Sequence, residues 1–113
     1  AGPAYAAPRT NVEKVLARIV ADVLGIERAG VNDDFFALGG DSVLATSVIA
    51  RAREALDTTA LPVRVLFAQR TIARIARRFT ELESEPGRLE AVAGIWLMVQ
   101  DMSEEELAER LSQ

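Results

Sequence analysis

Apolar residues recur every three or four positions along most of this chain, and no stretch shows the alternation of a β-strand. Residues 11–24 are the clearest case, because their apolar side chains fall on one side of a helix. These side chains are Val12, Val15, Leu16, Ile19, Val20 and Val23. The pattern predicts an all-α fold. Helices are expected at residues 11–24, 42–56, 63–68, 72–84, 89–100 and 103–111.

Residues that favour helix ends mark several of these boundaries. Asn11 is expected to cap the first helix and Gly25 to end it. Thr71 is expected to cap the helix that begins at residue 72. Ser103 and Glu106 form the S-x-x-E pattern of a capping box, which predicts a new helix near the C-terminus.

The chain divides into three parts by composition. Residues 1–10 contain two prolines among small residues and are expected to be a linker. Residues 11–85 carry the regular helical pattern and are expected to form one compact domain, which Pro86 and Gly87 end. Residues 86–113 are expected to be a C-terminal helical extension, either a docking or an interdomain segment.

Residues 26–41 form a long connection before the second helix. Loops of this length in a small domain are usually functional or disordered. Apolar residues within the connection can hold it against the helices, which argues for function. The connection ends in FFALGGDS, so that Gly39, Gly40 and Asp41 lead directly to Ser42 at the expected start of a helix.

Composition narrows what Ser42 can do. The sequence has no histidine and no cysteine, and Lys14 is its single lysine. A serine nucleophile needs a base to take its proton, and the usual base is histidine, so hydrolase activity is not expected. The absence of cysteine also excludes disulfides and thiolate metal sites, and no metal site is expected. Two readings remain at this point: Ser42 is a helix cap, or it is the target of a covalent modification that the two glycines leave accessible.

Charge and hydropathy limit the partners and the location. The net charge is −4, although residues 58–80 contain five arginines and no acidic residue. Without aromatic side chains beside them, these arginines are expected to form a solvated helix face, and nucleic-acid binding is not expected. The longest apolar run, residues 91–99, is too short for a bilayer, which needs about 20 residues. No signal peptide is recognised, so we expect a soluble cytoplasmic protein with no membrane partner.

The segment DDFFALGGDSVLATSVIAR closely resembles the attachment-site motif of peptidyl carrier proteins, the thiolation domains of nonribosomal peptide synthetases. The similarity extends to VEKVLARIVADVLGIERAGVNDDFFALGGDS, which matches the first helix and long loop of that family. LPVRVLFAQRTIARIARRF matches the third and fourth helices. About residues 10–82 are covered, and the motif is specific at this spacing.

The resemblance implies a bundle of four helices with a short third one. It also implies that Ser42, with Gly40 and Asp41 before it, is the attachment site of a phosphopantetheine arm. A separate phosphopantetheinyl transferase would add the arm from coenzyme A. The thiol of the arm would then hold an amino acid or peptide as a thioester, so this chain would be a carrier without catalysis of its own, in natural product biosynthesis.

The family resemblance also suggests partner surfaces. Val43 and Thr46 lie beside the expected buried stripe of the second helix, and the residue matching Val43 contacts partners in similar carriers. Arg64 and Val65 on the short third helix are expected at the same end. The expected partners are the transferase, an adenylation domain, and a condensation, heterocyclisation, epimerisation or thioesterase domain.

Two residues depart from the family pattern. Many such carriers have histidine directly before the serine, where this chain has Asp41, which leaves the downstream domain open. Many also have proline before the threonine of the fourth helix, where this chain has Arg70. An acyl carrier of a polyketide pathway remains an alternative, as does a helical interaction module in which Ser42 is a cap.

The extension is more apolar than an ordinary linker. It contains the single tryptophan, Trp96, which is expected to contact a partner, together with Ile95 and Met98 on an adjoining face. Three arrangements are open: the extension packs on its own carrier with its acidic end near the basic fourth helix, docks a neighbouring domain or protein, or dimerises. It also slightly resembles the segment after the carrier in synthetases that build heterocyclic siderophores.

Overall fold

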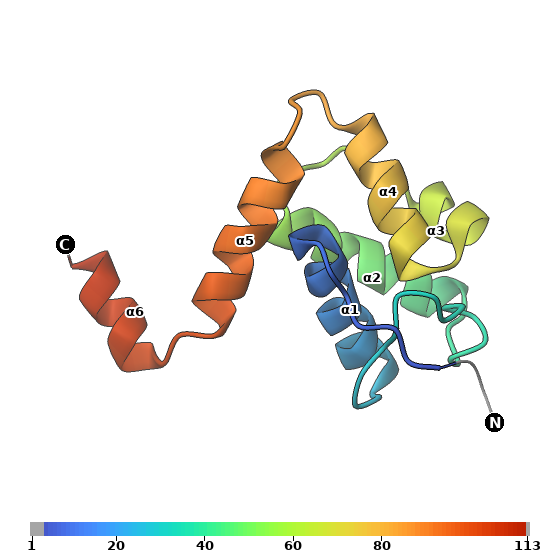
Figure 1. Cartoon of the computed structure of the whole chain (residues 1–113), viewed down its shortest axis with the longest axis horizontal. Helices are drawn as coiled ribbons and strands as arrows, with labels where there is room; N and C mark the ends of the chain where they lie inside the picture. The colour runs from blue at the N-terminus through green and yellow to red at the C-terminus, as the bar shows by residue number, and fades with distance from the viewer. Residues whose placement is uncertain (1–3, 113) are drawn as a thin grey trace.

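A computed structural model of the chain describes residues 4–112. Within these residues all regular elements are helices, as predicted, and Figure 1 shows their arrangement. The helices are α1 (Asn11–Leu24), α2 (Ser42–Ala55), α3 (Val63–Gln69), α4 (Ile72–Leu82), α5 (Arg88–Gln100) and α6 (Glu104–Leu111). No helix within residues 4–112 has the length and apolar content needed to cross a membrane.

Helices α1 to α4 form the bundle that holds the core. α1 contacts α2 and α4, and the short α3 contacts α2 and α4. The core is built mainly from aliphatic side chains, which include Leu16, Ile49, Leu56 and Leu66, with Phe79 of α4 fully buried among them. The four-helix arrangement with a short third helix, expected from the sequence, is confirmed.

The start of α1 differs from the prediction. Thr10, not Asn11, is the N-cap: its side chain accepts a hydrogen bond from the backbone N–H of Glu13, and the Glu13 carboxylate accepts from the N–H of Thr10. This reciprocal pair is a complete capping box. Asn11 instead faces α5. The other predicted caps, Thr71 and Ser103, are confirmed, as is Gly25 at the end of α1, with φ of 67°.

The N-terminal segment and the long loop run beside each other. The backbone N–H of Val31 donates to the carbonyl of Ala6 over 2.9 Å, and the Arg28 guanidinium lies 3.8 Å from the centre of the Tyr5 ring. The side chains of Val31 and of Phe35, four residues later in the loop, are buried in the core. The apolar anchors therefore hold the loop, as the sequence suggested.

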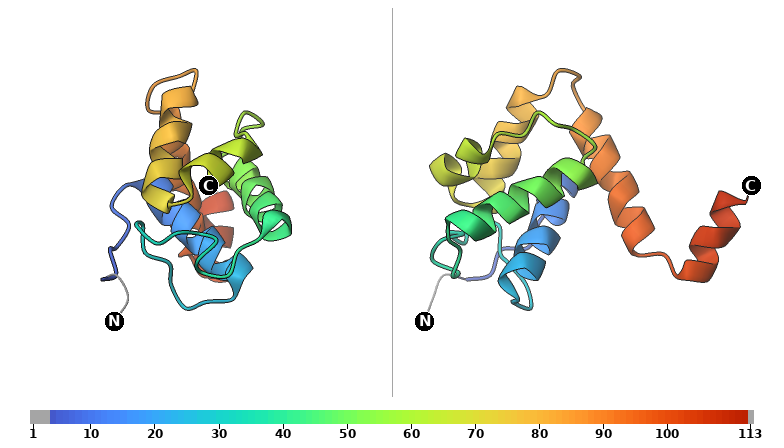
Figure 2. Two further views of the ribbon diagram at one scale, coloured as in Figure 1. Left: turned by 90° about the vertical axis from the view of Figure 1, so that its right-hand side faces the viewer. Right: turned by 180° about the vertical axis from the view of Figure 1, so that it is seen from behind.

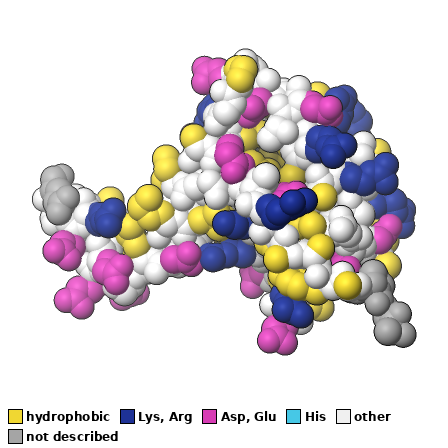
Figure 3. All heavy atoms as spheres, viewed as in Figure 1, with side chains coloured by type: hydrophobic (Ala, Val, Ile, Leu, Met, Phe, Trp, Pro, Cys, Tyr) yellow, Lys and Arg dark blue, Asp and Glu magenta, His cyan; other side chains and the backbone are white. Residues whose placement is uncertain are grey.

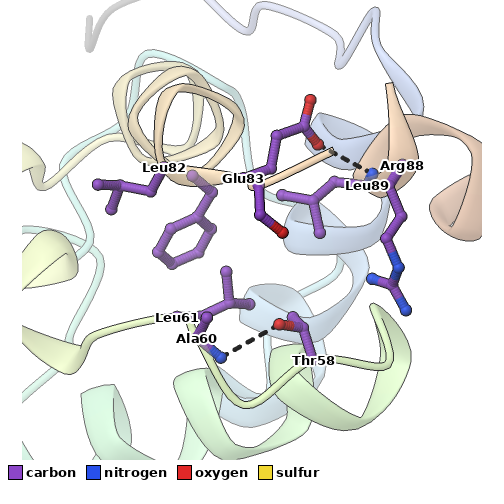
Figure 4. A pocket seen from close by; sticks show the side chains of 9 residues that line it. Thr58, Ala60, Leu61, Leu82, Glu83, Arg88 and Leu89 are labelled. Atoms are coloured by element: carbon purple, nitrogen blue, oxygen red, sulfur yellow. Dashed lines mark hydrogen bonds between the residues drawn. The ribbon is translucent and has the colours of Figure 1, made fainter. Parts of the chain in front are cut away.

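The link between α4 and α5 is closed by Glu83. One carboxylate oxygen accepts from the N–H of Gly87 at 2.7 Å, and the other from the N–H of Leu89 at 3.0 Å. Figure 4 shows this corner, where Leu61, Leu82 and Leu89 surround a small pocket between α4, α5 and the loop after α2. The turn brings α5 back against the bundle.

α5 packs on the bundle of its own chain, which was one of the three arrangements left open. It contacts α1 and α2, while the acidic α6 lies far from the basic α4 (Figure 1). Leu89 and Ala93 are buried in the interface. α6 turns away from the bundle at the far end of α5, as Figures 1 and 2 show.

Candidate functional site

Ser42 is the first residue of α2, and its side chain is exposed. Asp41 before it is the N-cap, since the Asp41 Oδ1 atom accepts a hydrogen bond from the backbone N–H of Leu44 at 2.8 Å. Asp41 has extended backbone angles, which are typical of a capping residue. The alternative in which Ser42 is a helix cap is therefore wrong, because Asp41 occupies that role.

The backbone around Ser42 is well ordered by local hydrogen bonds. The Thr46 hydroxyl donates to the carbonyl of Ser42 at 2.9 Å, one helical turn on. At the N-terminus of a helix the first N–H groups have no partner within the helix, and they produce a positive partial charge there. The Ser42 oxygen thus lies where a covalently attached anion is favoured.

The two glycines before Ser42 have different roles. Gly39 has φ of +110°, which favours glycine, and a Cβ there would meet no atom within 4 Å. Gly40 is in contact with the Phe35 ring, and a Cβ at Gly40 would overlap that ring. Gly40 therefore serves the packing of its own loop, while Gly39 provides the open approach that we expected of both residues.

An aromatic group supports the loop directly before Ser42. The rings of Phe35 and Phe36 meet edge to face, with 5.2 Å between their centres. Phe36 is also stacked on Phe67 of α3 at 5.5 Å. Phe67 was not among the residues expected at the site, although its side chain is 39% exposed there. The sequence signal that could have identified Phe67 is an aromatic residue at an outward position of a short helix.

Arg70, where many carriers have proline, joins the same group. Its guanidinium lies 4.7 Å from the centre of the Phe36 ring and pairs with the Asp34 carboxylate at 2.6 Å. The Arg70 backbone carbonyl also accepts from the N–H of Phe35. The corner between α3 and α4 is thereby tied to the loop that leads to Ser42.

The same ion pair perturbs Asp34. The hydrogen bond from Arg70 holds the pKa of the Asp34 carboxyl below its ordinary value of 3.8. Bonds from the backbone N–H groups of Ala37 and Phe36 act in the same direction, while partial desolvation opposes them. The carboxylate is therefore stabilised in its charged form.

The other predicted contact residues fall into two groups. Val43 is 77% exposed, and Thr46 and Arg64 are exposed as well, so these three lie on the surface near Ser42 or on the neighbouring α3. The prediction for Val65 was wrong, because its side chain is 4% exposed and belongs to the core. In a helix of seven residues, one position separates an outward side chain from a buried one.

Trp96 lies elsewhere. It is on α5, where its half-buried side chain packs against the core of its own chain. A shallow pocket there is lined by Trp96, Ile19 and Ala55, at the end of α2 opposite Ser42. The structure therefore separates Trp96 from the other predicted contact residues and makes it part of the interface that holds α5.

Comparisons with known proteins show which family shares this sequence. The family model described as phosphopantetheine attachment site matches residues 14–79. Phenyloxazoline synthase MbtB of Mycobacterium tuberculosis is 52% identical over 101 residues, which are 88% of this chain and 7% of the synthase. The chain thus spans a small part of the curated relatives it matches.

Several solved structures are similar to the chain, and two of them bear on its function. One is a peptidyl carrier protein in complex with the phosphopantetheine transferase Sfp and coenzyme A, with 40% identity and a TM-score of 0.61 over 66% of this chain and 95% of that chain. The other is a docking domain complex of the Pax synthetase, PaxA T1-CDD/PaxB NDD, with 27% identity and a TM-score of 0.59 over 100% of this chain and 94% of that chain. The chain belongs to the phosphopantetheine attachment site family, as a peptidyl carrier domain of the nonribosomal peptide synthetase type.

Proposed function

We propose that Ser42 is the residue of this carrier domain to which phosphopantetheine is attached. The observation that carries the proposal is the division of roles at the start of α2. Asp41 caps the helix, so the exposed Ser42 hydroxyl is not needed for that purpose. Gly39 adds open space on the approach. A transferase can therefore reach the Ser42 oxygen without displacing a structural hydrogen bond of the cap.

The surroundings of Ser42 fit a phosphodiester. The positive end of α2 favours its negative charge, and no bulky side chain stands at Gly39. The carboxylate of Asp41 is close, but it is engaged with the backbone N–H of Leu44. In the transfer, the Ser42 Oγ atom forms the new bond to the phosphorus next to the pantetheine, and the P–O–P linkage of coenzyme A breaks. Adenosine 3′,5′-bisphosphate leaves with the bridging oxygen, and the hydroxyl proton of Ser42 passes to a base of the transferase.

We propose that the chain has no catalysis of its own. The sequence lacks histidine, so no imidazole can act as a general base beside Ser42. When attached, phosphopantetheine supplies a thiol that holds an aminoacyl or peptidyl group as a thioester. The carrier's own residues present that arm at the exposed end of α2, and the enzymes that load and unload it provide the chemistry.

The surface that these enzymes would contact surrounds Ser42. It includes Val43 and Thr46 on α2, and Arg64 and Phe67 on α3. An exposed apolar residue beside polar ones is typical of a site for transient contacts. We propose that the transferase and an adenylation domain bind this surface in turn, followed by a condensation, heterocyclisation, epimerisation or thioesterase domain.

Among the later partners, a heterocyclisation domain has the most support. The relative at 52% identity is a phenyloxazoline synthase, and an oxazoline is a heterocycle. Asp41 in place of histidine before the serine agrees with a partner other than an ordinary condensation domain.

For residues 86–113 we propose a docking role. The similarity to the PaxA T1-CDD/PaxB NDD complex covers the whole chain, including α5 and α6. The packing of α5 on the carrier does not oppose this role, because it leaves one side of α5 exposed.

The test of the attachment site is intact mass after incubation with coenzyme A and a phosphopantetheinyl transferase. Wild type should gain one phosphopantetheine and Ser42→Ala none. Ser47→Ala, a matched serine variant in the same helix, should gain one. If Ser42→Ala is still modified, Ser42 is not the attachment residue.

A further inference from the structure

α5 is apolar around its whole circumference. The sequence from Leu89 to Val99 contains one acidic residue, Glu90, and no basic one. With 100° between successive residues, Leu89, Ala93 and Trp96 fall on one side of the helix, and Met98 falls on the opposite side. Ile95 and Val99 lie between these two sides, on one flank of the helix. Helices that are apolar on all sides are normally covered on all sides.

The bundle covers only one side of α5. Leu89 is 3% exposed and Ala93 is 0% exposed, both against the bundle, and the Trp96 side chain is half-buried. On the outer side Ile95 is 60% exposed, Met98 50% and Val99 38%. We call these three residues the outer face of α5. Figure 3 shows hydrophobic side chains along this helix.

Polar bonds at both ends hold α5 in place. The Glu90 carboxylate accepts from the backbone N–H groups of Asn11 and Val12, at 2.6 and 3.1 Å. Arg88 donates to the carbonyl of Leu56 at 3.2 Å. At the far end Asp101 pairs with Arg18 at 2.9 Å. The outer face is therefore presented on a helix that is fastened to the carrier, not on a free tail.

α6 adds a charged border to this surface. Glu104, Glu105, Glu106 and Glu109 are all exposed, against one basic residue of the helix, Arg110. The Arg110 guanidinium lies 3.8 Å from the Met98 sulfur, which links α6 to the outer face. α6 also carries two apolar residues that are not fully buried, Leu107 and the exposed Leu111. In Figure 3 the acidic side chains stand over α6, next to the hydrophobic ones of α5.

We infer that the outer face of α5 and the adjoining side of α6 bind an amphipathic helix with lysine or arginine on its flanks, supplied by another domain or chain of the synthetase. Its apolar stripe would cover Ile95, Met98 and Val99, and its basic flank would pair with the α6 carboxylates. Methionine and aliphatic side chains adapt readily to such a stripe. The inference rests on the proposed docking role of residues 86–113 and names the surface and the chemistry of its partner.

This surface lies far from Ser42. α5 contacts the C-terminal half of α2 through Ala55 and Leu56, whereas Ser42 begins the same helix. A helix of 14 residues is about 20 Å long. Figure 1 shows the two regions on opposite sides of the bundle. A partner helix can therefore stay bound while enzymes reach the arm on Ser42.

The test uses the full chain and a fluorescent synthetic helical peptide of about 20 residues, with leucines at i, i+3, i+4 and i+7 and lysines on the flanks. A second peptide carries glutamate in place of every lysine. Fluorescence anisotropy should show binding of the lysine peptide, at least about tenfold weaker binding of the glutamate peptide, and weakening by salt. Ile95→Gln and Met98→Gln, singly and together, should weaken binding of the lysine peptide by about tenfold or more.

The control is Tyr5→Gln, a 41% exposed side chain on the N-terminal segment, which should bind the lysine peptide as wild type does. Circular dichroism should show the same melting for all variants. Mass after transferase treatment should show that Ile95→Gln is modified normally, so that a failure of docking is distinguished from a failure of the attachment site.

Equal binding of both peptides, or no loss of binding in the Met98 and Ile95 variants, would overturn the inference. Dimerisation of the chain that Ile95→Gln abolishes would also overturn it, in favour of a second copy.

Discussion

α4 and α5 both pack against α1, but the outer side of α4 is charged and the outer side of α5 is apolar. α4 buries Ile72, Ile75, Ala76 and Phe79, and its outer side carries Arg74, Arg77 and Arg78 in solvent. α5 fully buries Leu89 and Ala93 alone, and its outer side is apolar. The two helices follow one another in the chain and contact the same bundle.

The outer side of α4 is stable in water, whereas the outer side of α5 is apolar and not covered by the bundle. Arginine side chains are stable in water, so α4 needs nothing beyond the bundle. The outer face of α5 gains free energy only when another molecule covers it. Polar bonds at both ends of α5 add to the attachment that its buried residues provide. The comparison leads to three predictions about stability, from the largest effect to the smallest.

The first prediction compares the loss of stability when one buried side chain is shortened in each helix. Phe79→Ala should lower the free energy of unfolding by about 3–5 kcal/mol, because the Phe79 ring is fully buried and its loss leaves a cavity. Leu89→Ala should cost about 2 kcal/mol, at the low end for such changes, because Leu89 borders a pocket that can relax. Urea denaturation gives both values. A larger cost at Leu89 would show that α5 is as central to the fold as α4.

The second prediction concerns the polar attachment of α5. Glu90→Ala should cost about 1 kcal/mol, the usual effect of losing a side chain that accepts from helix N-terminal N–H groups. Hydrogen exchange at the Asn11 and Val12 amides should become faster, because both lose their acceptor. Glu85→Gln, an exposed glutamate in the preceding turn, is the control. Unchanged exchange in Glu90→Ala would mean that α5 is held by its apolar contacts alone.

The third prediction concerns acid and the ion pair at the start of α4. The pKa of Asp34 is lowered in the folded chain, chiefly by Arg70, so the charged carboxylate stabilises the fold above its ordinary pKa. This contribution is lost as the pH falls through the lowered pKa. Asp34→Asn should therefore be less stable than wild type near pH 7, and the difference should shrink towards about pH 2.

Urea midpoints at several pH values check this prediction. The effect should be small, because Arg70 and Asp34 are both partly exposed. A stability difference between Asp34→Asn and wild type that does not change with pH would contradict this role of the Asp34 carboxylate.

Short-range features of the sequence predicted much of the fold. Each helix was expected within a few residues of its observed bounds, because apolar spacing and capping residues act over one or two turns. The exposed serine at the start of α2 was expected for the same reason. Even locally, two candidates can compete: Thr10 rather than Asn11 caps α1, because Glu13 completes the capping box with threonine.

The sequence by itself determined an all-α chain, its helix boundaries and the position of Ser42 at a helix start, since these follow from interactions between residues a few positions apart. Only the tertiary structure decided that Val65 is buried, that Gly40 makes room for Phe35, and that Glu90 binds the start of α1, 79 residues away. It also decided which side of α5 meets the bundle. A helix that is apolar all round carries no pattern that distinguishes its two sides, so packing alone could assign Ile95 and Met98 to the surface.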